Sequence, residues 1–409
     1  MTTAVLEIDG VSATRRVVPT TAAELAEVVQ AADHDGQALA PVGGGTQLDL
    51  GMPPTRLDVV VDTTALDGVV EYEPADLTIT VEAGIRFSRL QRLLAEQGQC
   101  LALDPPAEDG ATLGGLIATN TSGPLRFAYG TPRDLVLGMR IANPDGALTH
   151  AGGRVVKNVA GYDLNKLYIG SLGTLGVIVE LSLKLAPIPP ASGAVVARFS
   201  DLDTARGLLN AVVRSPLAPL AIELLGPGAS NAAGLPEGKL IVFRVGGYPQ
   251  AVERQARDLS ELLRQHGGQR LDVPETAWDD LASSRVAALR NSALVCKAAA
   301  PLSSSTALVS ILEQRFQELD PVVWAHAGNG VAFAACSAPP DSRVLLEARR
   351  EVGGLGSNAS LVIQRCPTEL KRSLDVWGEP GSSLPLMRAL KNKLDPRHTL
   401  NPGRYVGGI

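Results

Sequence analysis

Apolar and polar positions alternate in short stretches over the first half of the chain, a pattern typical of a mixed α/β domain. "TTAAELAEVVQAAD", from Thr20 to about His34, places Leu25, Val28 and Val29 at helical spacing behind a threonine cap and predicts a helix. The apolar runs "GQALAPVGGG" and "LDVVVDTTAL" predict two short strands. "LTITVEAGI" alternates as a strand does, and "FSRLQRLLAEQG" predicts an amphipathic helix that ends at Gly98.

The pattern changes after a proline cluster, "LAPIPPASG", which we interpret as the end of a first domain, residues 1–188. Strand, loop and helix segments then recur, and they predict an α+β domain over 189–345 whose sheet carries helices on one face. Residues 346–409 form a last segment with the helical run "PLMRALKNKL" and the turn-rich tail "DPRHTLNPGRYVGGI". Since this tail ends in glycines and apolar residues, we expect it to be docked on the first domain.

The length of 409 residues is sufficient for two or three domains. Lys and Arg number 37 against 43 Asp and Glu, a net charge of -6, and no basic run is present, so nucleic acid is not an expected partner. No secretory signal and no run of 18 apolar residues is found, which favours a cytoplasmic protein. Four widely separated cysteines fit a reducing compartment and provide neither a zinc pair nor a cluster motif, so an iron–sulfur cluster would belong to another chain: Cys100, Cys296, Cys336 and Cys366.

Three consecutive glycines, Gly43, Gly44 and Gly45, follow the strand "LAPV" and precede Thr46. Backbone N–H groups of successive glycines can converge on an anion, but a tight turn explains the same residues equally well. A Rossmann fingerprint would need glycine where Leu48 stands, and a Walker loop would need Gly-Lys-Ser/Thr. Neither familiar phosphate loop is present.

Two further glycine loops strengthen the anion-binding interpretation. "ATLGGLIATNTSG" (111–123) opens a helix of small residues, and "GYDLNKLYIGSLGTLGVI" (161–178) spaces Gly170, Gly173 and Gly176 three residues apart. A large cofactor with a pyrophosphate and a planar ring would use all three loops.

Taken in order, these motifs resemble the PCMH-type FAD domain shared by vanillyl-alcohol oxidase and the D-lactate and glycolate oxidoreductases. The resemblance covers about residues 15 to 190, through "PVGGGTQL", "YEPADLTITVEAG", "ATLGGLIATNTSGPLRFAYGTPRD" and "KNVAGYDLNKLYIGSLGTLGVIVELSLKLAP", and the tail resembles the family's closing Asp-Pro and Asn-Pro-Gly segment. In length and motifs the chain also resembles the FAD-binding E subunits of bacterial glycolate oxidases. The fold implied is α+β: a two-lobed PCMH-type FAD-binding domain, an α+β cap domain, and a C-terminal segment that returns to the FAD domain.

The resemblance also implies which residues hold FAD. The first loop would hold the pyrophosphate, the second the rest of the diphosphate and the isoalloxazine region, and the third the adenine end, with the tail returning toward the flavin. The implied set is Gly43, Gly44, Gly45, Thr46, Gln47, Thr112, Gly114, Gly115, Ser122, Gly123, Tyr129, Asp134, Gly170, Gly173, Val177, Ile178 and Asn401. Relatives that attach FAD covalently use His or Cys near these loops. Here neither residue occurs between 35 and 99 and Cys100 lies outside any glycine loop, so we expect noncovalent FAD.

Oxidation of a 2-hydroxy acid by a flavin needs a cation or metal for the carboxylate and a base for the hydroxyl. Related catalytic subunits carry His-x-Gly-Asp-Gly-Asn-x-His, whereas "WAHAGNGVAFA" keeps His326 but lacks the second histidine. We therefore expect no metal centre, and His326 is open to two interpretations, a substrate-site residue or a core histidine. Other candidates near substrate or flavin are also open to structural interpretations as salt-bridge, helix-start or packing residues: Arg126, Arg365, Arg404, Lys157, Tyr129 and Tyr162. His326, Lys157 and Arg365 remain the weak catalytic candidates.

Three functions follow as hypotheses. The first is a secondary flavin subunit of a glycolate oxidase-like complex that converts glycolate to glyoxylate, with a catalytic flavin subunit and an iron–sulfur subunit as partners and an association with the inner face of the membrane through them. The second is a self-sufficient FAD-dependent dehydrogenase of glycolate or D-lactate. The third is a non-enzymatic assembly scaffold with an empty flavin fold.

Overall fold

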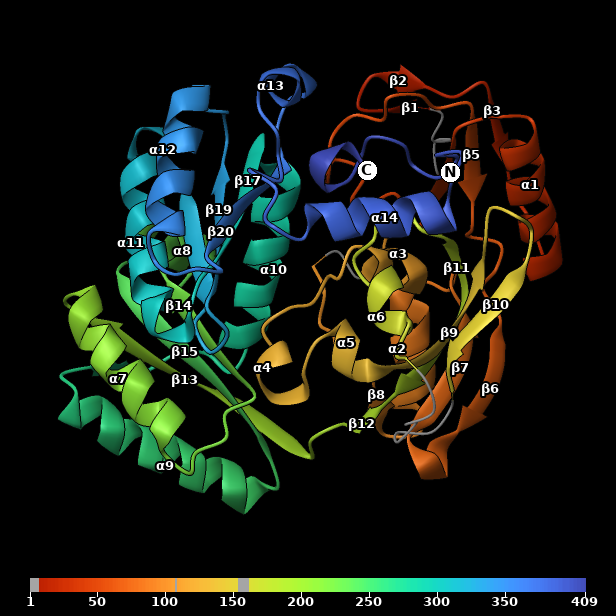
Figure 1. The fold of residues 1–409 in the computed structure, drawn as a ribbon. Coiled ribbons are helices and arrows are strands. Elements are labelled where there is room, and N and C mark those ends of the chain that lie inside the picture. Colours follow the sequence, from red (N-terminus) through yellow and green to blue (C-terminus); the bar gives the residue numbers. More distant parts are fainter. Residues whose placement is uncertain (1–6, 107–108, 154–161) are drawn as a thin grey trace. The chain divides into compact units, whose positions relative to one another are not determined.

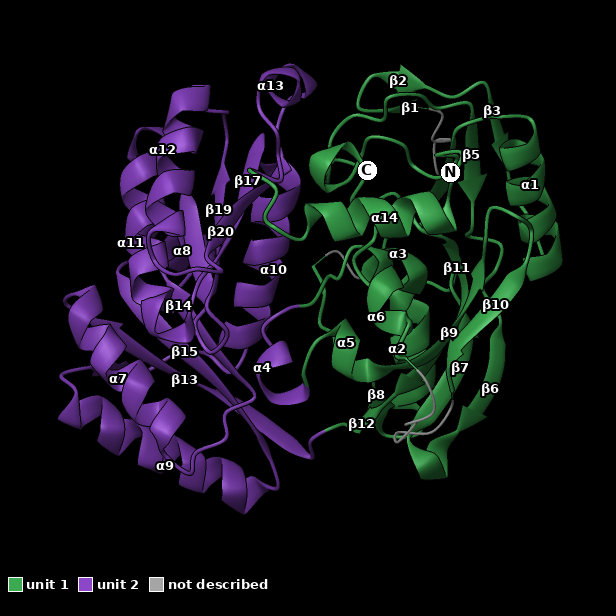
Figure 2. Cartoon of the chain, in the orientation of Figure 1, with its two compact units in different colours: residues 1–122, 130–188, 379–409 green, residues 123–129, 189–378 purple. Residues whose placement is uncertain are grey.

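The computed structural model describes residues 7–106, 109–153 and 162–409 (Figure 1). The chain divides into two compact units (Figure 2). Unit 1 comprises residues 1–122, 130–188 and 379–409, and unit 2 comprises residues 123–129 and 189–378. The tail therefore returns to unit 1, as expected. Residues 346–378, which the sequence pattern grouped with the tail, belong instead to unit 2.

Unit 1 contains a small parallel sheet in the strand order β3-β5-β4, packed against helix α1. Its elements are β3 (Arg15–Val17), α1 (Ala22–His34), β4 (Leu39–Val42) and β5 (Val59–Asp62). Thr21 caps α1 by accepting the Glu24 N–H at 3.1 Å, and the helix buries Leu25 and Val29 against the sheet. All residues of β5 are buried, which explains its unbroken apolar run.

The larger sheet of unit 1 is antiparallel, in the order β10-β9-β11-β7-β6. Its buried face includes Ile79, Val81, Leu181 and Leu183, which cluster with apolar residues of α2 and α3. The alternation recognised in residues 77–85 thus marks a strand with one core face. The elements are β6 (Val69–Glu73), β7 (Thr78–Glu82), α2 (Phe87–Ala95), α3 (Leu113–Ala118), β9 (Val136–Ala142), β10 (Leu148–Gly152) and β11 (Val177–Lys184).

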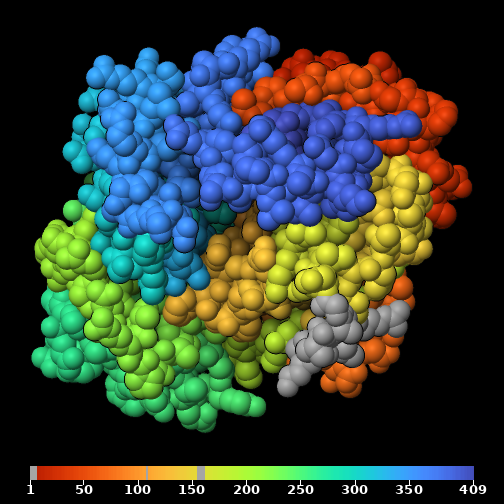
Figure 3. All heavy atoms as spheres, in the orientation of Figure 1, coloured from red at the N-terminus to blue at the C-terminus, as the bar shows by residue number. Residues whose placement is uncertain are grey.

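Short elements complete unit 1. Two two-stranded ladders join β1 to β2 and β8 to β12, and α14 begins the C-terminal segment. In the space-filling view the dark blue C-terminal segment forms a continuous surface with the red and yellow parts of unit 1 (Figure 3). The bounds are β1 (Glu7–Ile8), β2 (Val11–Ser12), β8 (Gln99–Cys100), α5 (Pro132–Leu135), α6 (Asn165–Tyr168), β12 (Ala186–Pro187) and α14 (Leu384–Leu394).

Unit 2 is built on an eight-stranded antiparallel sheet in the order β16-β13-β15-β14-β18-β19-β17-β20. Its strands are β13 (Ala191–Phe199), β14 (Ala221–Leu225), β15 (Lys239–Gly247), β16 (Gln269–Leu271), β17 (Leu294–Ala299), β18 (Val322–His326), β19 (Val331–Cys336) and β20 (Ser360–Arg365). Its helices are α4 (Arg126–Tyr129), α7 (Leu202–Arg214), α8 (Pro227–Ala232), α9 (Pro249–Gln265), α10 (Ala277–Asn291), α11 (Ser305–Phe316), α12 (Ser342–Gly353) and α13 (Thr368–Ser373).

Helices cover both faces of this sheet, so the expectation of helices on one face was wrong (Figure 1). Apolar residues of α8 and α10 cluster with the strand face that carries Val196, Val242 and Phe333. On the opposite face, helix α7 packs against α9 and α11, and α11 packs against α12. The alternation of small and large apolar residues did not reveal this, because strands buried on both faces lose their period-two signal. No helix of the described ranges is long and apolar enough to cross a membrane.

Candidate functional site

A cleft lies in unit 1 where the three glycine loops meet the C-terminal segment, and its empty space, open solvent included, is about 870 Å³. The cleft is lined by glycines, which expose their backbone, by apolar side chains, and by two polar residues of the C-terminal segment. The lining comprises Ile8, Pro41, Val42, Gly43, Gly44, Gly45, Thr46, Gln47, Leu48, Thr63, Thr112, Gly114, Gly115, Leu116, Ala118, Thr119, Leu172, Gly173, Gly176, Val177, Ile178, Asn401 and Arg404.

The first glycine loop leaves β4 at its carboxyl end. Gly45 adopts φ +71, a conformation that favours glycine, and a Cβ on Gly43 would overlap the Thr112 Oγ1 atom. Among the described residues, none accepts a hydrogen bond from the N–H groups of residues 43–47. These amides are therefore available to an anion, as in a phosphate-binding nest.

The second loop opens α3. Thr112 is its N-cap, buried and within 3.4 Å of the Gly115 N–H, while the Gly114 N–H donates to the Ala83 carbonyl at 2.7 Å. The Gln47 amide donates to Thr121 Oγ1 at 2.8 Å and joins this loop to the first. This hydrogen bond thus joins the two glycine loops at one corner of the cleft.

The C-terminal segment supplies the remaining wall through Asn401 and Arg404. Asn401 is 6% exposed; its Nδ2 donates to the Leu172 carbonyl at 2.6 Å, and its buried Oδ1 has no hydrogen-bond partner among the described residues. Arg404 donates to the carbonyls of Leu48 and Leu50, at 2.8 and 2.6 Å, directly after the glycine loop. Burial lowers the pKa of the Arg404 guanidinium, against the opposing charges of two aspartates.

These residues fit FAD. Available amides and a buried arginine suit a diphosphate, apolar Ile8, Val177 and Ile178 suit the flat faces of rings, and the Asn401 Oδ1 atom can accept a hydrogen bond from the cofactor. An unsatisfied buried acceptor costs about 1–3 kcal/mol, so a ligand that supplies a donor would remove this cost.

Most of the residues assigned to FAD from the sequence line this cleft, and five do not: Ser122, Gly123, Tyr129, Asp134 and Gly170. Gly123 and Tyr129 belong to unit 2. Asp134 caps α5 by accepting the Thr131 N–H at 2.8 Å, and this bond is the main cause that lowers its pKa. Gly170 adopts φ +81 and donates to the Ile117 carbonyl, so it supports α3. A direct role of these residues in binding FAD stays a prediction.

Unit 2 contains a buried polar cluster centred on Glu223. Glu223 (β14) and His326 (β18) are cross-strand neighbours, and the Glu223 carboxylate lies 2.7 Å from the His326 Nδ1 atom and 2.6 Å from Arg285. Burial lowers the pKa of His326, although Glu223 opposes the shift. His326 is therefore a buried residue of unit 2 paired with Glu223, and its role at a substrate site stays a prediction. No group of three or more metal-ligating side chains occurs in the described part of the chain.

Lys297, which the sequence patterns did not single out, lies on the same face of the sheet. It stands opposite Phe333 in the β17–β19 register, and the Phe333 ring packs against His326 with centroids 5.2 Å apart. Burial, together with the positive charge of Arg126, lowers the pKa of Lys297 to about 8. A single lysine within the apolar strand "ALVCKAAA" was the signal that could have identified it.

Among the described residues, the remaining catalytic and flavin-site candidates from the sequence are not found in the unit 1 cleft or in the Glu223 cluster of unit 2. Arg365, at the end of β20, donates to the carbonyls of Leu289 and Arg290. The side chain of Tyr162 is 92% exposed. Lys157 lies outside the described residues.

Comparisons with known proteins agree with this geometry. Residues 13–152 match the family model described as a FAD binding domain, and residues 378–405 match the C-terminal domain of FAD linked oxidases. The chain is 28% identical over 425 residues to the mitochondrial D-lactate dehydrogenase [cytochrome] of Arabidopsis thaliana, covering 95% of this chain and 73% of that protein. It is 40% identical over 169 residues to the glycolate oxidase subunit GlcE of Escherichia coli (strain K12), covering 41% of this chain and 48% of that subunit.

A solved structure also shares the fold. The crystal structure of p-cresol methylhydroxylase with substrate bound superposes with a TM-score of 0.78 at 15% identity, covering 96% of this chain and 88% of that one.

Proposed function

We propose that this chain is a FAD-linked oxidoreductase that binds FAD through its FAD-binding domain, residues 13–152. The N–H groups of Gly43 to Gln47, together with Arg404, would hold the diphosphate of noncovalent FAD in the unit 1 cleft. The observation that carries this assignment is the convergence of those available amides and the unsatisfied Asn401 Oδ1 atom on one cleft.

The reaction is the oxidation of a small 2-hydroxy acid to the 2-oxo acid. Bound FAD would accept the hydride from C2 of the substrate, while the hydroxyl proton leaves to a base. The support is the similarity of nearly the whole chain to a D-lactate dehydrogenase.

Within this reaction class, the chain works as a secondary flavin subunit of a glycolate oxidase-like complex, beside a catalytic flavin subunit and an iron–sulfur subunit. The 40% identity to the GlcE subunit supports this role. The surroundings of His326 agree with this role, because no group of three or more metal-ligating side chains includes it in the described part of the chain. A single histidine does not provide a metal site of the kind that a second histidine would complete.

A second candidate is a self-sufficient 2-hydroxy-acid dehydrogenase, and Lys297 beside Arg126 favours it. Two neighbouring cations in a partly buried site bind a carboxylate well, and their mutual repulsion, which contributes to the low pKa of Lys297, would be relieved by an anion. Lys297 and Arg126 would then orient the substrate carboxylate.

One experiment separates the two candidates. The purified chain, loaded with FAD, is mixed with glycolate or D-lactate and a dye acceptor, and flavin absorbance is followed. The subunit proposal predicts no bleaching by the chain alone and activity only with the partner chains. Rapid bleaching that is lost in Lys297→Met but kept in Lys393→Met would establish the self-sufficient enzyme.

A further inference from the structure

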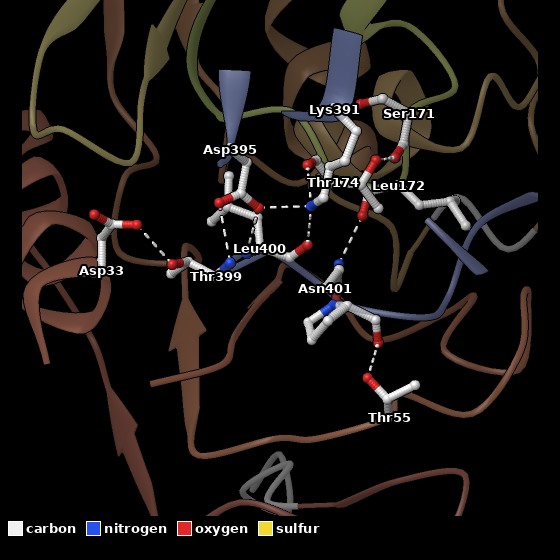
Figure 4. Close-up of polar contacts among 11 residues, drawn as sticks. Asp33, Thr55, Ser171, Leu172, Thr174, Lys391, Asp395, Thr399, Leu400 and Asn401 are labelled. Atoms are coloured by element: carbon white, nitrogen blue, oxygen red, sulfur yellow. Dashed lines mark hydrogen bonds and ion pairs between the residues drawn. The ribbon is translucent and has the colours of Figure 1, made fainter. Parts of the chain in front are cut away.

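Lys391 and Asp395, at the end of α14, form a fully buried ion pair, with side chains 1% and 0% exposed (Figure 4). Lysine and aspartate are seldom buried to this extent. The Lys391 Nζ atom donates three hydrogen bonds: to the Asp395 carboxylate at 2.6 Å, the Leu400 carbonyl at 2.9 Å and the Thr174 carbonyl at 2.8 Å. All three ammonium protons are engaged, so the charge is fixed in one geometry.

The Asp395 carboxylate shapes the turn that follows α14. One of its oxygens accepts the Thr399 N–H at 3.0 Å, and the other accepts the Leu400 N–H at 2.8 Å as well as the lysine. The Thr399 hydroxyl extends the network by donating to Asp33 at 2.8 Å. Residues 395–400 are therefore folded around the ion pair (Figure 4).

This turn delivers the tail to the strand that leads into the glycine loop. The Leu39 N–H donates to the Thr399 carbonyl at 2.7 Å, and the Asn401 N–H donates to the Leu39 carbonyl at 2.8 Å. Leu400 thus adds to the edge of β4 as a parallel bridge. Strand β4 ends at Val42, and Gly43 follows four residues after Leu39.

The same lysine also holds the third glycine loop. Thr174, whose carbonyl accepts the lysine, lies between Gly173 and Gly176, both of which line the cleft. The adjacent Leu172 carbonyl accepts the Asn401 amide. One ammonium group therefore links the tail to a cleft-lining loop, while its carboxylate partner fixes the tail against β4.

We propose that Lys391 and Asp395 are positioning residues of the FAD site, and that their ion pair couples docking of residues 395–404 to occupancy of the cleft. The proposal rests on the FAD site proposed above and adds its regulation. Because coupling is reciprocal, docking of the tail strengthens FAD binding by the same factor by which FAD stabilises the docked tail. A buried ion pair suits this role, since such pairs specify geometry more than they add net stability.

The experiment compares three chains: wild type, Lys391→Met, and Lys393→Met as the matched control, because Lys393 lies on the same helix but is exposed. FAD affinity is measured by flavin fluorescence, and backbone hydrogen exchange of residues 395–404 is measured with and without FAD. We expect FAD to slow exchange of these amides in wild type and in Lys393→Met. We expect Lys391→Met to raise the Kd for FAD at least tenfold and to lose the FAD-dependent protection.

The coupling is overturned if Lys391→Met binds FAD as tightly as Lys393→Met, or if FAD leaves exchange of residues 395–404 unchanged in wild type. The wild-type exchange measurement decides the matter even where the Lys391 variant does not fold. Asp395→Asn, which keeps the side-chain size but removes the charge, should reproduce the Lys391→Met effect. A wild-type chain that binds no FAD refutes the proposed cofactor site itself, whereas FAD binding without coupling refutes only the positioning role.

Discussion

Replacing Asn401 by glycine tests whether the tail contributes a hydrogen bond to the cofactor. Asn401 adopts φ +44, a conformation that glycine accepts without strain, so the backbone of the tail is preserved. Removing the unsatisfied Oδ1 atom stabilises the FAD-free protein by about 1–3 kcal/mol. Removing the hydrogen bond from Nδ2 to the Leu172 carbonyl destabilises the protein by about 1–3 kcal/mol. The added chain entropy of glycine costs about 0.5–1 kcal/mol.

These contributions nearly cancel in the FAD-free protein, so its free energy of unfolding should change by less than about 2 kcal/mol. In the FAD complex the variant lacks the hydrogen bond that relieves the unsatisfied Oδ1 atom of wild type, worth about 1–3 kcal/mol, which corresponds to a Kd about 5- to 160-fold higher. Because Nδ2 is already engaged, the lost bond is one in which Oδ1 accepts from the cofactor.

The assay combines urea unfolding of the FAD-free chain with titration of FAD by flavin fluorescence. His398→Gly is the matched control, since His398 adopts φ +53 in the same tail but is exposed and does not line the cleft. Asn401→Gly with the same FAD affinity as His398→Gly would refute the reasoning that Oδ1 faces the cofactor.

Three further predictions follow. Gly44→Ala places a Cβ atom against the Gly110 carbonyl and should weaken FAD binding, measured by titration, more than tenfold. Gly353→Ala, whose Cβ atom would meet no atom within 4 Å, should leave FAD binding unchanged. Equal affinities of the two variants would contradict the role of the glycine loop. Glu223→Gln leaves the largely buried Arg285 without its counter-charge and should lower the free energy of unfolding, measured with urea, by about 3 kcal/mol. Glu261→Gln, in an exposed pair, should change that free energy little. Under the second candidate function, glycolate binding measured by calorimetry should weaken as the pH rises through about 8, because Lys297 loses its charge there. A flat pH profile, or the same profile in Lys297→Met, would exclude this lysine.

Much of unit 1 follows from local sequence. The helix at α1, the strands β4, β5 and β7, and the start of α3 each carry a cap, an apolar run or a glycine that determines them locally. The glycine loops could be assigned to one cofactor because their spacing excludes the common nucleotide loops while their order resembles one family.

The rest depends on contacts between residues distant in sequence. Lys391 looks like an ordinary surface lysine of an amphipathic helix, and only the tertiary fold brings the Thr174 carbonyl and Asp395 around it. Lys297 and His326 acquire their shifted pKa values from burial and from charges on other strands and helices. The second helical layer of unit 2 was missed for the same reason, since strands covered on both faces carry no alternation.

The central claim is that the unit 1 cleft binds FAD, and the most direct measurement is titration of the purified chain with FAD, followed by absorbance of the bound flavin after gel filtration. We predict one FAD per chain, released on denaturation with acid because the attachment is noncovalent, and a Gly44→Ala chain that retains none. A wild-type chain that emerges colourless and takes up no added FAD would contradict the account and leave the assembly-scaffold hypothesis in its place.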